Sequence, residues 1–238
     1  MVPEKLIGEF TERLRAAAGA NLKAVILYGS AAAGDYVPEY SDVNLLCVLE
    51  ETSFAAIAAL GPTVEWWARQ KHHAPLLLTT DELRRGADVF SIEFLDMQQY
   101  HRLLWGEDVF KGLEIPMKLH RAQVEYELRE KTILLRQRLL AASGDAAAKW
   151  HLLLRSVSAF GTLARHALIA TGDTRAASKR EAVQRLAAKS GFDPSPFFQL
   201  LDLREGRLER KDLVLDELFA RYLAAVERVT MAVDTMLD

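Results

Sequence analysis

The sequence predicts an α/β domain followed by an all-α helical bundle. Over about the first hundred residues, short continuous apolar runs alternate with segments of helical spacing, whereas strand patterns stop after Pro116. Helix breakers cluster between Gly106 and Pro116, so we place the domain boundary there and assign residues 1–112 and 113–238 to the two domains. The chain has 238 residues, of which 50% are hydrophobic, which is enough to build both cores.

The α/β domain is expected to begin with a helix and a buried strand. Apolar residues recur at helical spacing over residues 4–18, and Gly19 follows at the place where a helix commonly ends. Residues 22–28 then form an apolar run that is rich in strand formers and stops at Gly29-Ser30. This run predicts a strand that ends in a turn of small residues.

The remaining elements of the first domain follow from the same two patterns. A second apolar strand is expected over residues 43–49 and a helix over residues 53–70. Residues 76–78 and 89–95 supply two further strand candidates.

The second half predicts helices only. Pro116 precedes a long amphipathic segment and Gly144 follows it, as is typical of the two ends of a helix. Breakers such as Gly172, Gly191 and Gly206 separate the later segments. The expected helices cover residues 117–142, 146–171, 178–190, 195–204 and 213–237.

The net charge of −3 favours neither a nucleic-acid partner nor a membrane surface. No window has the roughly 18 apolar residues of a membrane span, and the start of the chain does not have the pattern of a secretory signal, so a cytoplasmic protein is expected. The charge is divided unevenly, −6 over residues 1–112 and +3 over residues 113–238. An acidic domain of this kind would need metal ions to handle phosphates.

The most informative stretch connects the first two strands. The first strand ends in Gly29-Ser30, and the second opens with polar residues two apart, Asp42 and Asn44. Because side chains alternate along a strand, Asp42 and Asn44 share one face while Val43 faces the core. Oxygen ligands of this kind bind Mg²⁺ that is bound to a triphosphate. A serine hydroxyl and free backbone amides can bind the terminal phosphates of that triphosphate.

This stretch resembles the signature of the DNA polymerase beta-like nucleotidyltransferase superfamily, including the minimal and aminoglycoside nucleotidyltransferases. Gly29, Ser30 and Asp42 match that signature residue by residue. The resemblance implies a mixed sheet in the first domain, Mg²⁺ and a nucleoside triphosphate, with ATP expected, as cofactors, and an all-α partner domain. It also implies a third carboxylate from a later strand, for which Glu93 is the candidate because it alternates with apolar neighbours.

Two positions depart from the signature. Asn44 stands where the pattern has a second acid, and Ala31 to Ala33 stand where many members carry a basic residue. An amide oxygen ligates Mg²⁺ without adding negative charge, so metal affinity should fall.

The resemblance implies transfer of a nucleoside monophosphate from Mg²⁺-bound nucleotide to a hydroxyl of a small molecule or a protein. Asp42 and Glu93 would be the catalytic residues, Gly29 and Ser30 would bind nucleotide, and Asp42, Asn44 and Glu93 would hold the metal. The alternative is a catalytically degenerate module that kept the fold and serves nucleotide sensing or protein interaction. A polymerase-like enzyme acting on DNA or RNA is disfavoured because the chain lacks a basic stripe.

Two further segments carry expectations of their own. His72-His73 is expected in an exposed loop rather than at a metal, because two histidine ligands on a helix lie three or four residues apart. In the helix beginning near Pro116, apolar residues drift round the axis, which predicts contacts on more than one side. The helix is therefore expected to contact its own bundle and either the first domain or a second copy in a homodimer.

Overall fold

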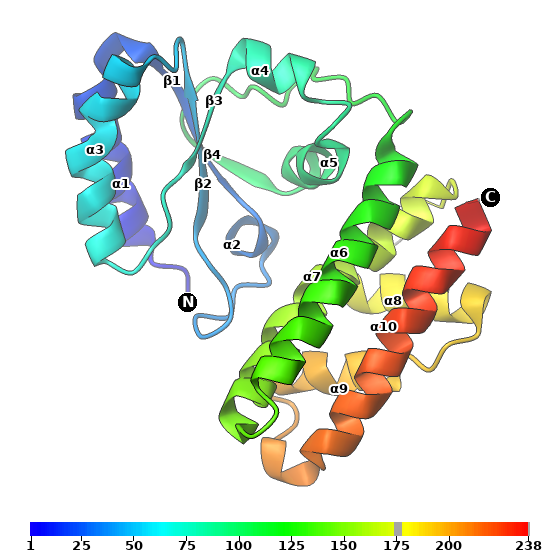
Figure 1. The fold of residues 1–238 in the computed structure, drawn as a ribbon. Helices are drawn as coiled ribbons and strands as arrows, with labels where there is room; N and C mark the ends of the chain where they lie inside the picture. The colour runs from blue at the N-terminus through cyan, green and yellow to red at the C-terminus, as the bar shows by residue number, and fades with distance from the viewer. Residues whose placement is uncertain (174–177, 238) are drawn as a thin grey trace. The chain divides into compact units, whose positions relative to one another are not determined.

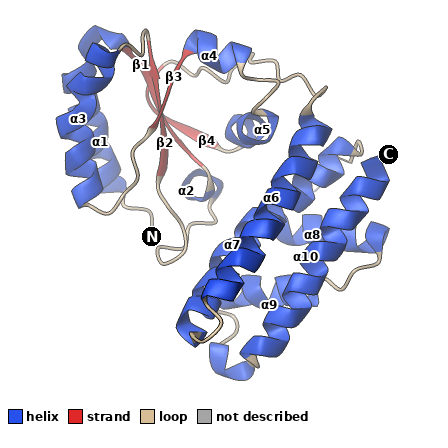
Figure 2. Ribbon diagram, viewed as in Figure 1, coloured by secondary structure: helices blue, strands red, loops and turns tan. Residues whose placement is uncertain are grey.

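The computed structural model describes residues 1–173 and 178–237 of the chain. It divides into two compact units, residues 1–116 and residues 117–238. The first unit contains the strands, which are drawn in red in Figure 2, and the second is helical over its described residues. The predicted order of an α/β domain and a helical bundle is confirmed.

The first unit is built on a four-stranded mixed sheet. Its strands are β1 (Leu22–Tyr28), β2 (Asn44–Leu49), β3 (Leu76–Thr79) and β4 (His101–Gly106), in the order β3-β2-β1-β4. The β1 strand pairs antiparallel with β2 and β4, whereas β2 pairs parallel with β3. The strands expected over residues 22–28, 43–49 and 76–78 are confirmed as β1, β2 and β3.

Helices cover the two faces of the sheet, which explains why β1 and β2 are continuous apolar runs. On one face, α1 (Glu4–Ala18) and α3 (Phe54–Arg69) pack side by side (Figure 1). The ring centroids of Phe10 and Trp67 lie 4.4 Å apart there, and both side chains are fully buried. The α1 helix ends at Gly19 with a positive φ of 52°, as its sequence predicts.

The other face is covered by α4 (Thr80–Arg85), α5 (Ser91–Gln99) and the segment that follows β4. Leu83, Phe94, Met97 and Phe110 pack there against the β1 and β2 residues that point away from α1. A capping box at Thr79 and Glu82 begins α4 directly after β3.

Residues 89–95 are not the strand that the sequence predicts, because they lie in the turn before α5 and in α5 itself. Alternation of Phe90, Ile92 and Phe94 suggests a strand, but Phe90 is 49% exposed while Phe94 is 2% exposed. In the helix, Phe94 and Met97 are three residues apart and reach the sheet together. A seven-residue window is too short to separate the two periods.

Two elements near the candidate site were not expected. The turn after Gly29 is the short helix α2 (Ser30–Ala33), closed by hydrogen bonds from the amides of Ala32 and Ala33 to the Gly29 carbonyl at 3.0 and 2.9 Å. The edge strand β4 occupies residues that the sequence did not assign to a strand.

The second unit consists of five long helices and a short 3₁₀ turn within its described residues. The predicted helices are confirmed to within three residues at their ends. They are α6 (His120–Ala141), α7 (Ala146–Ala170), α8 (Lys179–Ser190), α9 (Ser195–Arg204) and α10 (Leu215–Leu237).

Aromatic residues from three helices meet in the core of the second unit. The Tyr222 ring of α10 contacts Phe160 of α7 and Phe197 of α9, with centroids 6.2 and 5.1 Å apart. The buried Tyr222 hydroxyl accepts a hydrogen bond from the Ser156 hydroxyl at 3.1 Å. Over the residues that the structure describes, no helix combines the length and the apolar character needed to cross a bilayer.

Candidate active site

The pairing of β1 with β2 brings the two parts of the sequence motif together. Tyr28, the last residue of β1, is the register partner of Asn44, the first residue of β2. Gly29 and Ser30 therefore leave the sheet beside the point where Asp42 and Asn44 enter it. Ser30, Asp42 and Asn44 are all half-buried.

Gly29 and Asn44 are in close contact. Gly29 has φ 72° and ψ −152°, a backbone conformation that only glycine adopts readily. A Cβ atom at this position would lie 2.9 Å from Nδ2 of Asn44, so the side chain of Asn44 extends over the glycine. The small residue of the motif thus makes room for the polar residue at the start of the neighbouring strand.

The loop before Asp42 is held by its own hydrogen bonds. The Ser41 hydroxyl accepts from the Val37 amide at 3.0 Å, and the Ser41 amide donates to the Val37 carbonyl at 2.8 Å. Val43, directly after Asp42, is buried against α1 and α3, as predicted. Because side chains alternate along a strand, Asn44, the first residue of β2, faces the other side of the sheet, whereas Asp42 lies before the strand.

His73 lies beside Asp42, which the sequence analysis did not predict. Its Nε2 atom is 3.6 Å from Oδ1 of Asp42, and the His73 side chain is mostly exposed. The parallel pairing of β2 and β3 explains the contact, because the loop that leads into β3 lies at the same end of the sheet as the loop that leads into β2.

The neighbouring His72 is more buried than the exposed loop position expected for it. Its ring stacks on Trp67 with centroids 4.2 Å apart. Burial lowers the pKa of His72, an effect that the carboxylate of Asp42 opposes and that His73 reinforces. His72 is therefore placed to be neutral at pH 7.

Glu93 lies on a helix rather than on a strand, which corrects the expected position of the third carboxylate. It is half-buried in the first turn of α5, on the side of the sheet to which Tyr28 and Asn44 point. Burial raises the pKa of the Tyr28 phenol, and the charge of Glu93 raises it further. This influence of Glu93 on Tyr28 places the two side chains in the same neighbourhood.

A row of polar residues crosses the sheet at this end. Tyr28 of β1 has Asn44 of β2 as its partner on one side and His101 of β4 on the other. Nε2 of His101 lies 3.1 Å from Oδ1 of Asp108, and its ring packs on Phe110 at a centroid distance of 5.1 Å. Tyr28 and His101 were not expected in this row, and the strand-like run before Gly106 was the available signal for His101.

Asp42 and Asn44 could supply oxygen ligands to a Mg²⁺ ion, without forming a complete metal site of their own. Among residues 1–173 and 178–237, no group of three or more His, Cys, Asp or Glu side chains is arranged to hold a metal. Asp42 and Asn44 offer one carboxylate and one amide oxygen from neighbouring positions of the chain. Mg²⁺ commonly takes one or two protein carboxylates and completes its shell with substrate phosphates and water.

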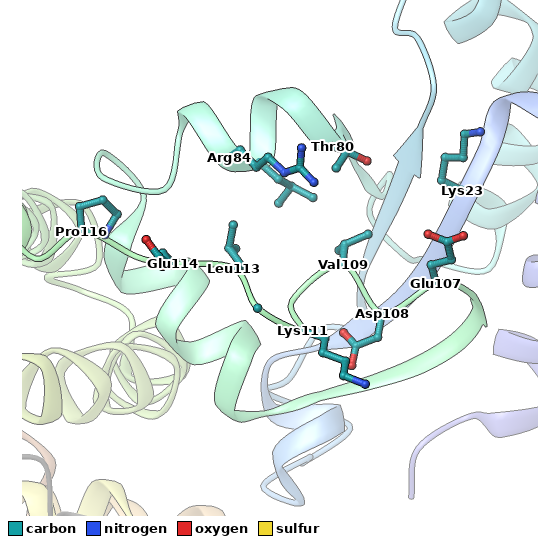
Figure 3. A pocket seen from close by; sticks show the side chains of 12 residues that line it. Lys23, Thr80, Arg84, Glu107, Asp108, Val109, Lys111, Leu113, Glu114 and Pro116 are labelled. Atoms are coloured by element: carbon teal, nitrogen blue, oxygen red, sulfur yellow. The ribbon is translucent and has the colours of Figure 1, made fainter.

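A pocket of about 740 Å³ lies elsewhere on the first unit (Figure 3). Side chains from α4, including Thr80 and Arg84, and from the segment after β4, including Asp108 and Lys111, line it. Lys23 lines it at the start of β1, whereas Gly29 follows the end of β1. The pocket therefore does not include Gly29 or Ser30, although one of its lining residues, Asp108, contacts His101.

The comparisons with known proteins support the fold. The structure is similar to the crystal structure of the spectinomycin adenyltransferase AAD(9) from Enterococcus faecialis with ATP and spectinomycin. The TM-score is 0.60 with 14% sequence identity, and the match covers 97% of this chain and 99% of that chain. The predicted resemblance to nucleotidyltransferases is thus confirmed at the level of the fold.

A second structural match, to a toxin-antitoxin complex with AMP-PNP, has a TM-score of 0.30 with 17% identity, and it covers 42% of this chain and 74% of that chain. This score is too low to support any argument. No protein-family model matches the sequence, and no curated protein matches it either.

Proposed function

We propose that the first unit transfers a nucleoside monophosphate from a Mg²⁺-bound nucleoside triphosphate to a hydroxyl group. The observation that carries the proposal is the contact between the two halves of the motif, with Asn44 extended over Gly29 and Asp42 two residues before it. The similarity of the fold to that of a spectinomycin adenyltransferase supports the proposal.

The residues divide into two groups by role. Asp42 and Asn44 bind the Mg²⁺ that accompanies the triphosphate, while Gly29 and the Ser30 hydroxyl bind terminal phosphates. ATP is the proposed nucleotide, and a small molecule or a protein supplies the acceptor hydroxyl. The AAD(9) structure contains ATP and spectinomycin, which supports the choice of nucleotide without identifying the acceptor.

The transfer needs a proton acceptor on the side of the incoming hydroxyl. The acceptor oxygen forms a bond to the α-phosphorus, the bond from that phosphorus to the bridging oxygen breaks, and pyrophosphate leaves. The proton of the hydroxyl passes to the Glu93 carboxylate. Burial and the charge of Glu93 both raise the pKa of Tyr28, so its phenol stays protonated near Glu93 at neutral pH.

The second candidate function is nucleotide binding without catalysis. Asn44 favours it, because an amide brings no charge to the metal and a ligand that bridges two metals is normally a carboxylate. The two candidates differ in their dependence on Mg²⁺ and in pyrophosphate release.

Calorimetric titration of ATP into the full chain, with and without Mg²⁺, tests the binding step. We expect Mg²⁺-dependent binding that Asp42→Asn abolishes and Asp81→Asn preserves, since Asp81 is an exposed residue of α4 paired with Arg85 at 2.9 Å. Weak binding that is identical with and without Mg²⁺ would support the non-catalytic alternative, and no binding at all would refute both.

Pyrophosphate release with water as the acceptor tests the chemical step. We expect slow release by the wild type and loss of release in Glu93→Gln with ATP binding unchanged. Equal release by the variant and the wild type would remove Glu93 from the proton-transfer role.

A further inference from the structure

The α6 helix has two opposite apolar faces, of which one is buried in the second unit. The buried face consists of His120, Val124, Leu128, Thr132 and Leu135. On the other side, four large apolar side chains are exposed. They are Leu119 at 41%, Tyr126 at 62%, Ile133 at 53% and Leu140 at 78%. We call these four residues the α6 stripe.

The stripe follows a strict spacing of seven residues. Seven residues are close to two helical turns, so the four side chains drift by only about 20° from one to the next. Leu128 is two residues after Tyr126, which is about 200° round the axis, so the buried face points away from the stripe. The bundle that covers the buried face therefore cannot also cover the stripe.

The neighbouring helix α10 extends the apolar surface. Arg129 of α6 pairs with Asp234 at 3.0 Å, and Arg136 pairs with Glu227 at 2.7 Å, so α10 runs antiparallel beside α6 (Figure 1). Met231 lies between Glu227 and Asp234 in α10 and is 55% exposed. Apolar side chains from both helices are thus exposed along one side of the bundle, as is typical of a protein interface.

Charges beside the stripe indicate which partner fits it. Arg129 is three residues after Tyr126 and Glu130 is four residues after it, so the two charges flank the stripe on opposite sides. Within the described part of the chain Glu130 forms no ion pair, whereas Arg129 contacts Glu125 and Asp234. A guanidinium has five N–H donors, which leaves Arg129 able to bind a further carboxylate.

The two ways of pairing α6 with a second α6 differ in these contacts. In a parallel pair about a two-fold axis along the helices, opposite flanks meet, so Arg129 faces Glu130 of the partner subunit and Glu130 faces the partner's Arg129. In an antiparallel pair the same flanks meet, which sets arginine against arginine and glutamate against glutamate. Only the parallel pair is self-complementary in charge.

We propose that the α6 stripe is the contact between two copies of this chain, paired in parallel about a two-fold axis. Each stripe residue then packs against its own counterpart, and the flanking charges form two symmetric ion pairs between the subunits. This proposal does not depend on the proposed enzymatic function, because it rests on α6 and α10 alone.

Disulfide cross-linking of single-cysteine variants tests the geometry. The only native cysteine, Cys47, is fully buried, so it does not compete. We expect Tyr126→Cys to form a covalent dimer on mild oxidation, because a parallel pair places the two copies of residue 126 opposite each other. Arg138→Cys, exposed on another side of α6, is the matched control and should stay monomeric.

The same assay separates the parallel pair from the antiparallel one. An antiparallel pair centred on the stripe would place residue 126 opposite residue 133 and leave like residues about 10 Å apart along the axis, beyond disulfide reach. Mixing Tyr126→Cys with Ile133→Cys would then yield only mixed dimers. That result would overturn the proposal, as would the absence of any cross-link.

The mass of the protein in solution gives an independent measurement. Light scattering of the wild-type chain should show a dimer, and Ile133→Glu should weaken the dimer at least tenfold. Ile133 faces away from its own bundle, so the circular dichroism of the variant should match that of the wild type. A wild-type chain that remains monomeric at about 100 μM, a concentration at which even a weak specific dimer is populated, would refute the proposal.

Discussion

Gly29→Ala tests whether the end of β1 depends on a residue without a side chain. At φ 72° and ψ −152° the backbone of Gly29 occupies a region that is essentially restricted to glycine. Forcing another residue into such a region costs about 1–3 kcal/mol. The new Cβ would also lie 2.9 Å from Nδ2 of Asn44, so that side chain must move. Rotating it off its preferred rotamer adds about 0.5–1.5 kcal/mol.

Gly34→Ala is the matched control for this substitution. Gly34 also has a positive φ, 87°, but a Cβ there meets nothing within 4 Å. Left-handed backbone alone costs a non-glycine residue about 1–2 kcal/mol. We therefore expect Gly29→Ala to lower the free energy of unfolding by about 2–4 kcal/mol and Gly34→Ala by about half as much.

Urea unfolding followed by tryptophan fluorescence measures the difference, since Trp66, Trp67 and Trp105 all belong to the first unit. Adding Asn44→Ala to Gly29→Ala should recover the part of the loss that comes from the contact, in a double-mutant cycle. A loss for Gly29→Ala no larger than that for Gly34→Ala, or no recovery on removal of the Asn44 side chain, would refute this role of Gly29.

Three further predictions concern charge and burial. Asn44→Asp should strengthen Mg²⁺ binding in the presence of ATP, because it adds a carboxylate beside Asp42, and equal affinities by calorimetry would contradict a metal-site role for this position. Burial raises the pKa of the Cys47 thiol to about 12, so a thiol reagent at pH 8 should react with the unfolded chain and not with the native chain; rapid labelling of native protein would disprove the buried position. A hydrogen bond from Ser195 and the charge of Arg221 hold the pKa of Asp193 below its ordinary value of 3.8. The Asp193 carboxylate therefore contributes stability above pH 3.8, and this contribution is lost as the pH falls through the lower pKa of the folded state. Asp193→Asn should thus destabilise the protein at pH 7 and have little effect near pH 2. An equal loss of stability at both pH values would refute this role of Asp193.

Local sequence patterns determined the elements whose apolar pattern extends over a full strand or over several helical turns. The apolar runs of β1 and β2 and the repeated helical spacing of α6 to α10 predict those elements, because each pattern is several turns or a full strand in length. The short run over residues 89–95 fits both periods, and there the packing of Phe94 and Met97 against the sheet decided in favour of a helix.

The candidate site shows the same division. Gly29, Ser30, Asp42 and Asn44 follow from the sequence, since a strand, a turn and the next strand lie within about twenty residues. Glu93 was expected on a strand and lies in α5, and its role in the site stays a prediction. His73 and His101 approach the site only through the parallel β2–β3 pair and the antiparallel β1–β4 pair.

The physical reason is the range of the interactions involved. The periodicity of apolar side chains depends only on residues that are close in the sequence, so it predicts helices and strands directly. The small residues after the first strand likewise predict the turn between β1 and β2. Strand order and register depend on which apolar faces meet across the whole unit. They bring together residues such as Tyr28 and His101, which are more than seventy positions apart. Only the tertiary structure decides those contacts.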